Sequence, residues 1–309
     1  MISDWLQINP NPEEILYGII YFSISLSLFP LYAVVMMALH SKMIKESCLT
    51  FTLMIIIYTV QLAQVICHFI TSPILIFPVL QLELRKVITI IGVTLNTFWI
   101  AELPATALLA VCRILVFSNL ITSKTLPSGV KLIIITFATW LSFVLIYGVI
   151  TDNFIFSSPA WKYDTSVYLA TTFEELELIS CFTSLVINYI SYALLAALIY
   201  LKKQASVSAS HRKNEVAILI QYTFLTTYTG ISIIAWHKGE LWFDMGSPRI
   251  QATINAFWIW GNCLNPVLLL VLNRSIRNES LRILRIKPNQ LGIGSNSYQM
   301  TQKRKSVMM

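Results

Sequence analysis

Charged residues are scarce in this sequence. Only 12% of its 309 residues are Asp, Glu, Lys or Arg, whereas 56% are hydrophobic, and a soluble domain carries roughly twice that share of charge. The apolar residues come in blocks of about 20 or more, the length that a helix needs to cross ~30 Å of hydrocarbon. The scarcity of charge therefore excludes an ordinary soluble domain and predicts an integral membrane protein. Its spans should be helices, because lipid cannot satisfy the hydrogen bonds of an open backbone.

Basic residues are missing from the start of the chain. The first 15 residues, MISDWLQINPNPEEI, contain three acidic residues and no Lys or Arg. A cleavable signal peptide needs a basic start and a short apolar core, so none is expected. An acidic start before a long apolar block predicts that residues 1–15 form an extracellular N-terminus and that the first span anchors it.

Residue clusters that could carry catalysis or bind a metal are also missing. The four histidines form no His/Cys pairing at the spacing of a metal site. The sequence contains no phosphate-binding loop, nucleophile elbow or paired catalytic carboxylates. We therefore expect no enzymatic activity, no cofactor and no bound metal.

Cysteine is rare where many membrane receptors carry a disulfide. None of the five cysteines lies in the loop 151–177 or at the start of the apolar block 87–117. A disulfide that joins this loop to that block is therefore excluded.

The apolar residues form seven blocks, each long enough to span a membrane: 16–39, 49–77, 87–117, 130–150, 178–201, 215–236 and 250–272. We predict an all-α membrane protein, with a seven-transmembrane bundle over residues 16–272. A short amphipathic helix should follow over 273–286, and a disordered cytoplasmic tail over 287–309.

The charges indicate how this bundle is oriented. With the N-terminus outside, the inner segments hold 17 of the 22 basic residues, and the outer segments hold 11 of the 15 acidic residues. The positive-inside rule favours this orientation. The net charge of +7 therefore indicates attraction to anionic membrane lipids and not binding to nucleic acid.

The last span contains an unusual polar cluster. Pro266 removes one backbone hydrogen bond, and Asn262 and Asn265 lie close to it in the sequence. Such a cluster predicts a hinge whose packing can switch. The chain then reads RSIRNESLRILRI, in which arginines surround one apolar face, as in a helix that lies on the membrane surface. The alternative is a simple proline kink followed by arginines that stop translocation.

The block 87–117 carries two ionisable residues on one helical stripe. Glu102 lies inside an otherwise apolar run, and Arg113 lies near its end; Leu95 and Trp99 share their face. Ionisable residues at membrane depth are costly and usually functional. Glu102 could anchor a ligand, hold a cation or act as a protonation switch, or it could be a protonated side chain bonded to a neighbouring helix. Arg113 could instead reach out to the lipid surface.

Three further carboxylates, Glu174, Glu175 and Glu177, cluster before the block 178–201. Their place at its expected water-facing start predicts a solvated rim.

The chain resembles the rhodopsin-like G-protein-coupled receptors, and among them the nematode serpentine chemoreceptors. The resemblance covers residues 16–286 and combines seven spans with Arg113, Trp140 and the pair Asn265 and Pro266. The patterns that carry it are AVCRILVF, NEVAILIQYTFL and NCLNPVLLLVLNRSIRNESLR.

Some usual features of these receptors are replaced. Cys112 stands where an acidic residue precedes the arginine, Leu269 stands where a tyrosine follows the proline, and block 215–236 has no proline. Block 250–272 has no lysine for retinal. Amine receptors carry their ligand-binding acid where this chain has Leu95.

The resemblance implies a chemosensory receptor in the plasma membrane, including the sensory cilium, that detects a small, apolar or weakly polar odorant. The expected partners are this ligand, a heterotrimeric G-protein and membrane lipids. Six residues are candidates for the ligand pocket: Leu95, Asn96, Trp99, Asn255 and Ile259, with Glu102 at its floor. The expected coupling and switch residues are Arg113, Lys202, Lys203, Arg212, Lys213, Asn262, Asn265 and Pro266. The alternative is a secondary transporter built around Glu102, although the matched repeats of carriers are not visible.

Overall fold

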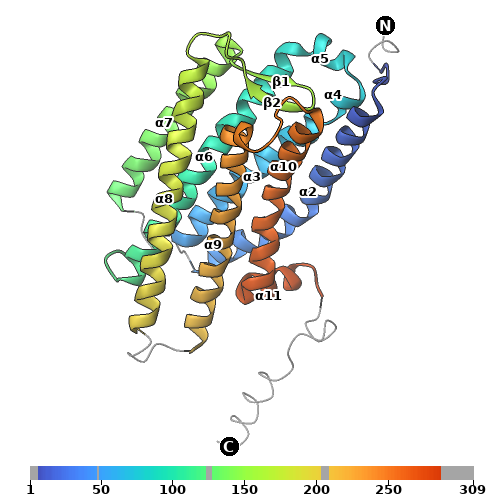
Figure 1. The fold of residues 1–309 in the computed structure, drawn as a ribbon. Coiled ribbons are helices and arrows are strands. Elements are labelled where there is room, and N and C mark those ends of the chain that lie inside the picture. The colour runs from blue at the N-terminus through green and yellow to red at the C-terminus, as the bar shows by residue number, and fades with distance from the viewer. Residues whose placement is uncertain (1–5, 47–48, 123–126, 203–208, 287–309) are drawn as a thin grey trace, which may run out of the picture.

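The computed structural model describes residues 6–46, 49–122, 127–202 and 209–286, with the backbone alone for 202 and 209–215. Seven long helices form a bundle (Figure 1). They are α2 (Pro12–Glu46), α3 (Leu49–Thr71), α6 (Arg85–Phe117), α7 (Ser128–Thr151), α8 (Ala170–Lys202), α9 (Ala209–Lys238) and α10 (Pro248–Leu272). Within the described residues, seven segments are long and apolar enough to cross a membrane. The predicted fold class is therefore confirmed.

Short elements mark the two ends of the bundle. Near one end lie α4 (Pro73–Ile76), α5 (Val79–Glu83), a 3-10 turn η1 (Gly239–Leu241) and a hairpin of β1 (Phe154–Ser157) and β2 (Ala160–Tyr163). At the other end, α11 (Arg274–Ile283) lies across the bundle (Figure 1). We refer to these as the hairpin end and the α11 end.

Six of the seven long helices extend beyond the predicted apolar blocks, whereas α3 ends at Thr71, before the end of block 49–77. For example, α8 begins at Ala170 and not at 178, and α2 continues to Glu46 and not to 39. Hydropathy marks the part of a helix that lies in hydrocarbon, whereas backbone hydrogen bonding continues into the polar membrane interface. The blocks therefore located the spans but underestimated the lengths of six of the helices.

Helix packing depends on a few small residues. Gly92 of α6 lies directly beneath the Trp161 ring, and a Cβ atom at this position would lie 2.1 Å from that ring. Gly148 of α7 is similarly close to Val93 of α6. Small residues allow such close approach where lipid provides no hydrophobic drive for helix association.

The hairpin packs into the bundle although no disulfide holds it. Phe154 and Trp161 stack with ring centroids 5.9 Å apart, and both are buried. All four cysteines of the described residues are free. The sequence predicted an outer loop over 151–177 but not the hairpin within it, because the apolar partners of this hairpin lie on a helix that is distant in the sequence.

Helix α11 is tied to the first helix of the bundle. Its N-cap, Asn273, accepts two backbone N–H bonds of 3.1 Å each. Its buried Glu279 accepts hydrogen bonds from Ser41 Oγ at 2.5 Å and Lys45 Nζ at 2.8 Å, both on α2. The hydrogen bonds from Arg282, and then those from Lys45 and Ser41, lower the pKa of Glu279 to about 2.

Candidate functional site

Glu102 is the centre of a polar network in the middle of the bundle. Its two carboxyl oxygens accept hydrogen bonds from Gln61 Nε2 at 2.6 Å and Gln64 Nε2 at 2.8 Å. Both glutamines belong to α3, so these bonds join α3 to α6. Of the roles predicted for Glu102, the bond to a neighbouring helix is therefore present, but its partners are neutral amides.

The bonds on the far side of the glutamines fix how their amides are oriented. Gln64 Oε1 accepts from Trp258 Nε1 at 3.1 Å, and an indole nitrogen can only donate. Gln61 Oε1 accepts from Asn265 Nδ2 at 2.9 Å. Each glutamine therefore presents its NH2 group to Glu102, and the carboxyl group acts as an acceptor on both sides.

Asn265 extends the network toward the α11 end. Its Oδ1 atom accepts from Tyr58 OH and from Gln221 Nε2, each at 3.0 Å. The next residue, Pro266, is an internal proline of α10. A continuous chain of side-chain bonds therefore links Glu102, through Gln61, to the predicted hinge.

Three cavities follow one another from the hairpin end to Glu102. The vestibule, of about 250 Å³, lies next to the hairpin and is lined by Trp161, Tyr163, Glu174, Trp236 and Ile254 among others. The constriction, of about 10 Å³, shares Trp236 and Ile254 with the vestibule. The chamber, of about 30 Å³, shares Trp99, Ser232 and Trp258 with the constriction. These shared walls define a path from the hairpin end to the middle of the bundle.

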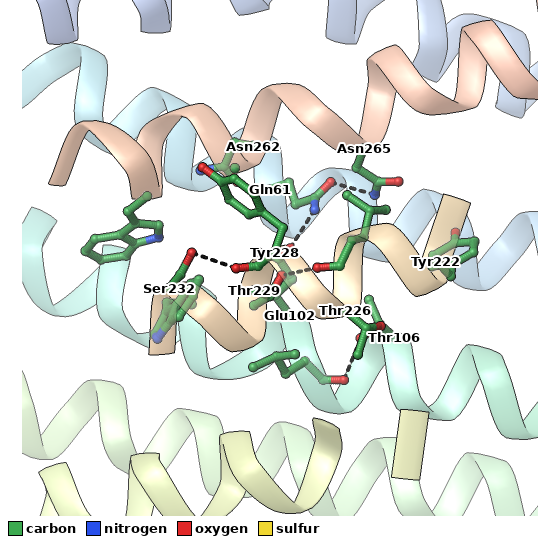
Figure 2. A pocket seen from close by; sticks show the side chains of 15 residues that line it. Gln61, Glu102, Thr106, Tyr222, Thr226, Tyr228, Thr229, Ser232, Asn262 and Asn265 are labelled. Carbon is green, nitrogen blue, oxygen red and sulfur yellow. Dashed lines mark hydrogen bonds between the residues drawn. The ribbon is translucent and has the colours of Figure 1, made fainter. Parts of the chain in front are cut away.

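The chamber is small, and polar and apolar side chains line it together. Figure 2 shows the side chains that line it, including Gln61 with its bonds to Glu102 and Asn265. Its volume is enough for one or two waters, so a larger ligand requires the walls to move. Hydroxyl groups of α9, such as Thr229 and Ser232, face Glu102 of α6 across this space.

Three tryptophans surround the constriction. Trp258 packs edge to face against Trp99 and Trp236, with ring centroids 5.3 and 5.4 Å apart. All three line the constriction. Movement of these rings would control passage between the vestibule and the chamber.

Glu177 holds this aromatic cluster to the hairpin. It accepts from Tyr163 OH at 2.6 Å and Trp99 Nε1 at 3.0 Å, and His237 Nε2 lies 3.4 Å from it. Tyr163 OH also accepts from Asn96 Nδ2 at 2.6 Å. Burial and the nearby Glu177 carboxylate raise the pKa of Tyr163 well above its ordinary value.

The solvated rim predicted for the three carboxylates is wrong for one of them. Glu177 is only 3% exposed, whereas Glu175 is exposed and Glu174 is partly buried. The helix α8 begins before these residues, so one of its turns directs Glu177 into the bundle. Because the three acidic residues are close together in the sequence, we predicted the same exposure for all of them, although their side chains point in different directions.

The six residues predicted for a ligand pocket divide into two groups. Asn96 and Trp99 line the constriction, and Trp99 and Glu102 line the chamber. Leu95, Asn255 and Ile259 are buried in the packed core and line none of the three cavities. Asn262 and Asn265, predicted as hinge residues, also line the chamber.

Arg113 is buried at the α11 end of α6. It is 6% exposed, and its guanidinium lies 5.0 Å from the centroid of the Tyr222 ring. Its Nη2 atom lies 3.9 Å from Met54 Sδ, and no described residue accepts a hydrogen bond from its Nε or Nη1 atom. The side chain therefore does not reach out to the lipid surface.

The basic residues predicted for coupling fall outside what the structure describes. Lys203 lies outside the described residues, and so do the side chains of Lys202, Arg212 and Lys213. Their role remains a prediction.

Gln61 and Gln64 were not among the site residues predicted from the sequence. Both lie in an apolar run of α3, three residues apart, and therefore on one face of that helix. This spacing of two amides in a membrane span was the available signal. Within the described residues, no group of three His, Cys, Asp or Glu side chains could hold a metal.

A comparison with protein families gives one match that covers nearly the whole chain. The family model described as serpentine type 7TM GPCR chemoreceptor Srt matches residues 4–292. No curated protein matches the sequence.

Proposed function

Because the chain belongs to the serpentine 7TM GPCR chemoreceptor family Srt, we propose that it detects a small molecule inside its bundle and signals to a heterotrimeric G-protein. The ligand would enter from the vestibule, pass the three tryptophans and reach the chamber. The hairpin end would then face outside the cell and the α11 end the cytosol, in the plasma membrane. This orientation agrees with the distribution of basic residues.

The observation that carries this proposal is the bonded path from the chamber to the α11 end. Gln61 contacts Glu102 in the chamber wall and Asn265 beside Pro266. A ligand that competes for Glu102 would therefore change the bonds available to Asn265. A ligand can shift a two-state equilibrium only by binding one state better, and this path supplies such a difference.

At the α11 end, Arg113 is the residue proposed to respond. In the described state it is buried against Tyr222 of α9 and Met54 of α3. Movement of α9 away from α6 would remove the Tyr222 ring and expose the guanidinium, whose Nε and Nη1 donors lack partners within the described residues. An exposed guanidinium offers several donors to acceptor groups on a G-protein.

The test is ligand-dependent nucleotide exchange in cells that express the receptor with a G-protein reporter and an odorant panel. Arg113→Ala should abolish the response and leave surface expression near normal. Lys131→Ala removes an exposed cation from α7 near the same end and should leave the response unchanged. Loss of the response in both variants would contradict the proposal. Accumulation of a substrate in vesicles without nucleotide exchange would also contradict it.

A further inference from the structure

Four of the six hydroxyl groups that line the chamber donate their protons to the backbone. Thr229 Oγ1 donates to Leu225 O at 2.9 Å and Ser232 Oγ to Tyr228 O at 3.1 Å. Thr106 Oγ1 donates to Leu103 O at 2.7 Å, and Tyr228 OH donates to the carbonyl of Phe257. A hydroxyl has one proton and two lone pairs, so these groups can offer only acceptor sites to the chamber (Figure 2).

Glu102 adds two further acceptor oxygens to the same space. Both already accept amide N–H bonds, an arrangement that suits a carboxylate better than a carboxylic acid. Within the described part of the chain, no Lys, Arg or His forms an ion pair with Glu102. A buried carboxylate without a cation is costly, so a cation in the chamber would stabilise the ionised form of Glu102.

Two aromatic rings favour the same kind of occupant. Trp99 and Trp258 line the chamber on its side toward the constriction. The face of an indole ring attracts a cation that lies within ≈ 6 Å. A cation that passes the constriction therefore lies beside these rings before it reaches the carboxylate.

One unpartnered donor indicates a second feature of the occupant. Asn262 lines the chamber, is 3% exposed, and its Nδ2 atom has no hydrogen-bond partner among the described residues. A buried N–H group without a partner is unfavourable. An acceptor oxygen on the occupant would satisfy it.

We propose that the receptor recognises a small primary ammonium compound that also carries an acceptor oxygen, such as an amino alcohol. Once the chamber walls have moved apart to admit the compound, the ammonium group donates to Glu102 and to the hydroxyl oxygens of Thr229 and Ser232, and the oxygen accepts from Asn262. This inference rests on the proposed function and replaces the apolar odorant expected from the sequence. The acid that binds the amine lies deeper in α6 than Leu95, where amine receptors carry theirs.

The experiment measures binding to the purified full-length receptor in lipid nanodiscs, with ethanolamine as the probe and ethylene glycol as its uncharged analogue. Ethanolamine should bind saturably and raise the melting temperature, whereas ethylene glycol should not. Glu102→Gln should weaken ethanolamine binding by about tenfold to a hundredfold, the value of a hydrogen bond to a charged group. Glu175→Gln removes an exposed carboxylate of α8 and should leave binding unchanged.

A second variant keeps the test valid if Glu102→Gln does not fold. Thr229→Val keeps the side-chain shape but removes one acceptor, and should weaken ethanolamine binding by about three- to tenfold. Equal binding of ethylene glycol and ethanolamine, or unchanged binding in both variants, would overturn the inference. A receptor that signals to uncharged odorants but ignores ethanolamine would overturn this inference alone and leave the proposed function intact. If ethanolamine binds but no ligand causes nucleotide exchange, the proposed function is overturned and the recognition of an amino alcohol stands.

Discussion

The two glutamines of α3 provide a matched test of the path between the chamber and the hinge. Gln61→Leu leaves Glu102 Oε1 and Asn265 Nδ2 without their bonds, whereas Tyr32 OH loses a 3.4 Å bond to Gln61 but keeps its bond to Asn262 O. Gln64→Leu leaves Glu102 Oε2 and Trp258 Nε1 without theirs. Each change therefore deprives two buried groups of a partner, but only the first reaches Asn265.

The expected losses of stability are similar for the two variants. An unsatisfied buried polar group costs about 1–3 kcal/mol, so each substitution should destabilise the receptor by about 2–6 kcal/mol. The chamber has room for water beside Glu102, which favours the lower part of this range. The measurement is thermal or denaturant unfolding of the detergent-purified protein.

The expected effects on signalling differ. Gln61→Leu should change basal and ligand-dependent nucleotide exchange, because the bond between the chamber and Asn265 is lost. Gln64→Leu should lower ligand affinity and leave basal exchange near that of the unchanged receptor. Identical changes of basal exchange in both variants, or none in Gln61→Leu, would refute a path that runs through Gln61.

Three further predictions concern the two ends of the bundle. The pKa of Glu279 is about 2 against an ordinary 4.5, so its contribution to stability is present above pH 4.5 and is lost as the pH falls toward 2. Melting temperatures measured over this range should fall, and Glu279→Gln should flatten that part of the profile. Gly92→Ala places a Cβ atom 2.1 Å from the Trp161 ring and should cost about 1–3 kcal/mol of unfolding free energy, whereas Gly129→Ala, with nothing within 4 Å, should not destabilise. Tyr163→Phe removes the hydrogen bonds to Asn96 and Glu177 and should increase hydrogen exchange in residues 154–163; unchanged exchange would show that ring stacking alone holds the hairpin.

The fold was predictable because it depends on the length and hydrophobicity of segments. Seven apolar blocks predicted seven membrane helices, and each block corresponds to one helix of the bundle. Glu102 also stood out, because a carboxylate within an apolar run is rare at membrane depth. These signals are local in the sequence and need no knowledge of how helices are rotated against one another.

The contacts of the site depend on that rotation and were not predictable. Helical phase placed Leu95 on the same face as Trp99, and Ile259 on the same face as Asn262. However, Leu95 and Ile259 are completely buried against neighbouring helices. Glutamine is neutral and has no preferred partner, so the sequence alone could not assign Gln61 to Glu102. The hairpin escaped prediction because Trp161 packs on Gly92, a distant position in the sequence.

The attachment of the hairpin has a practical consequence for producing the receptor. Its anchors are the Tyr163 hydrogen bonds and the buried Phe154 and Trp161 rings, none of which needs an oxidant to form. Cell-free synthesis into nanodiscs with a thiol reductant present should therefore yield the same hairpin end as expression through an oxidising secretory pathway. Functional and structural work on this chain can begin from such preparations.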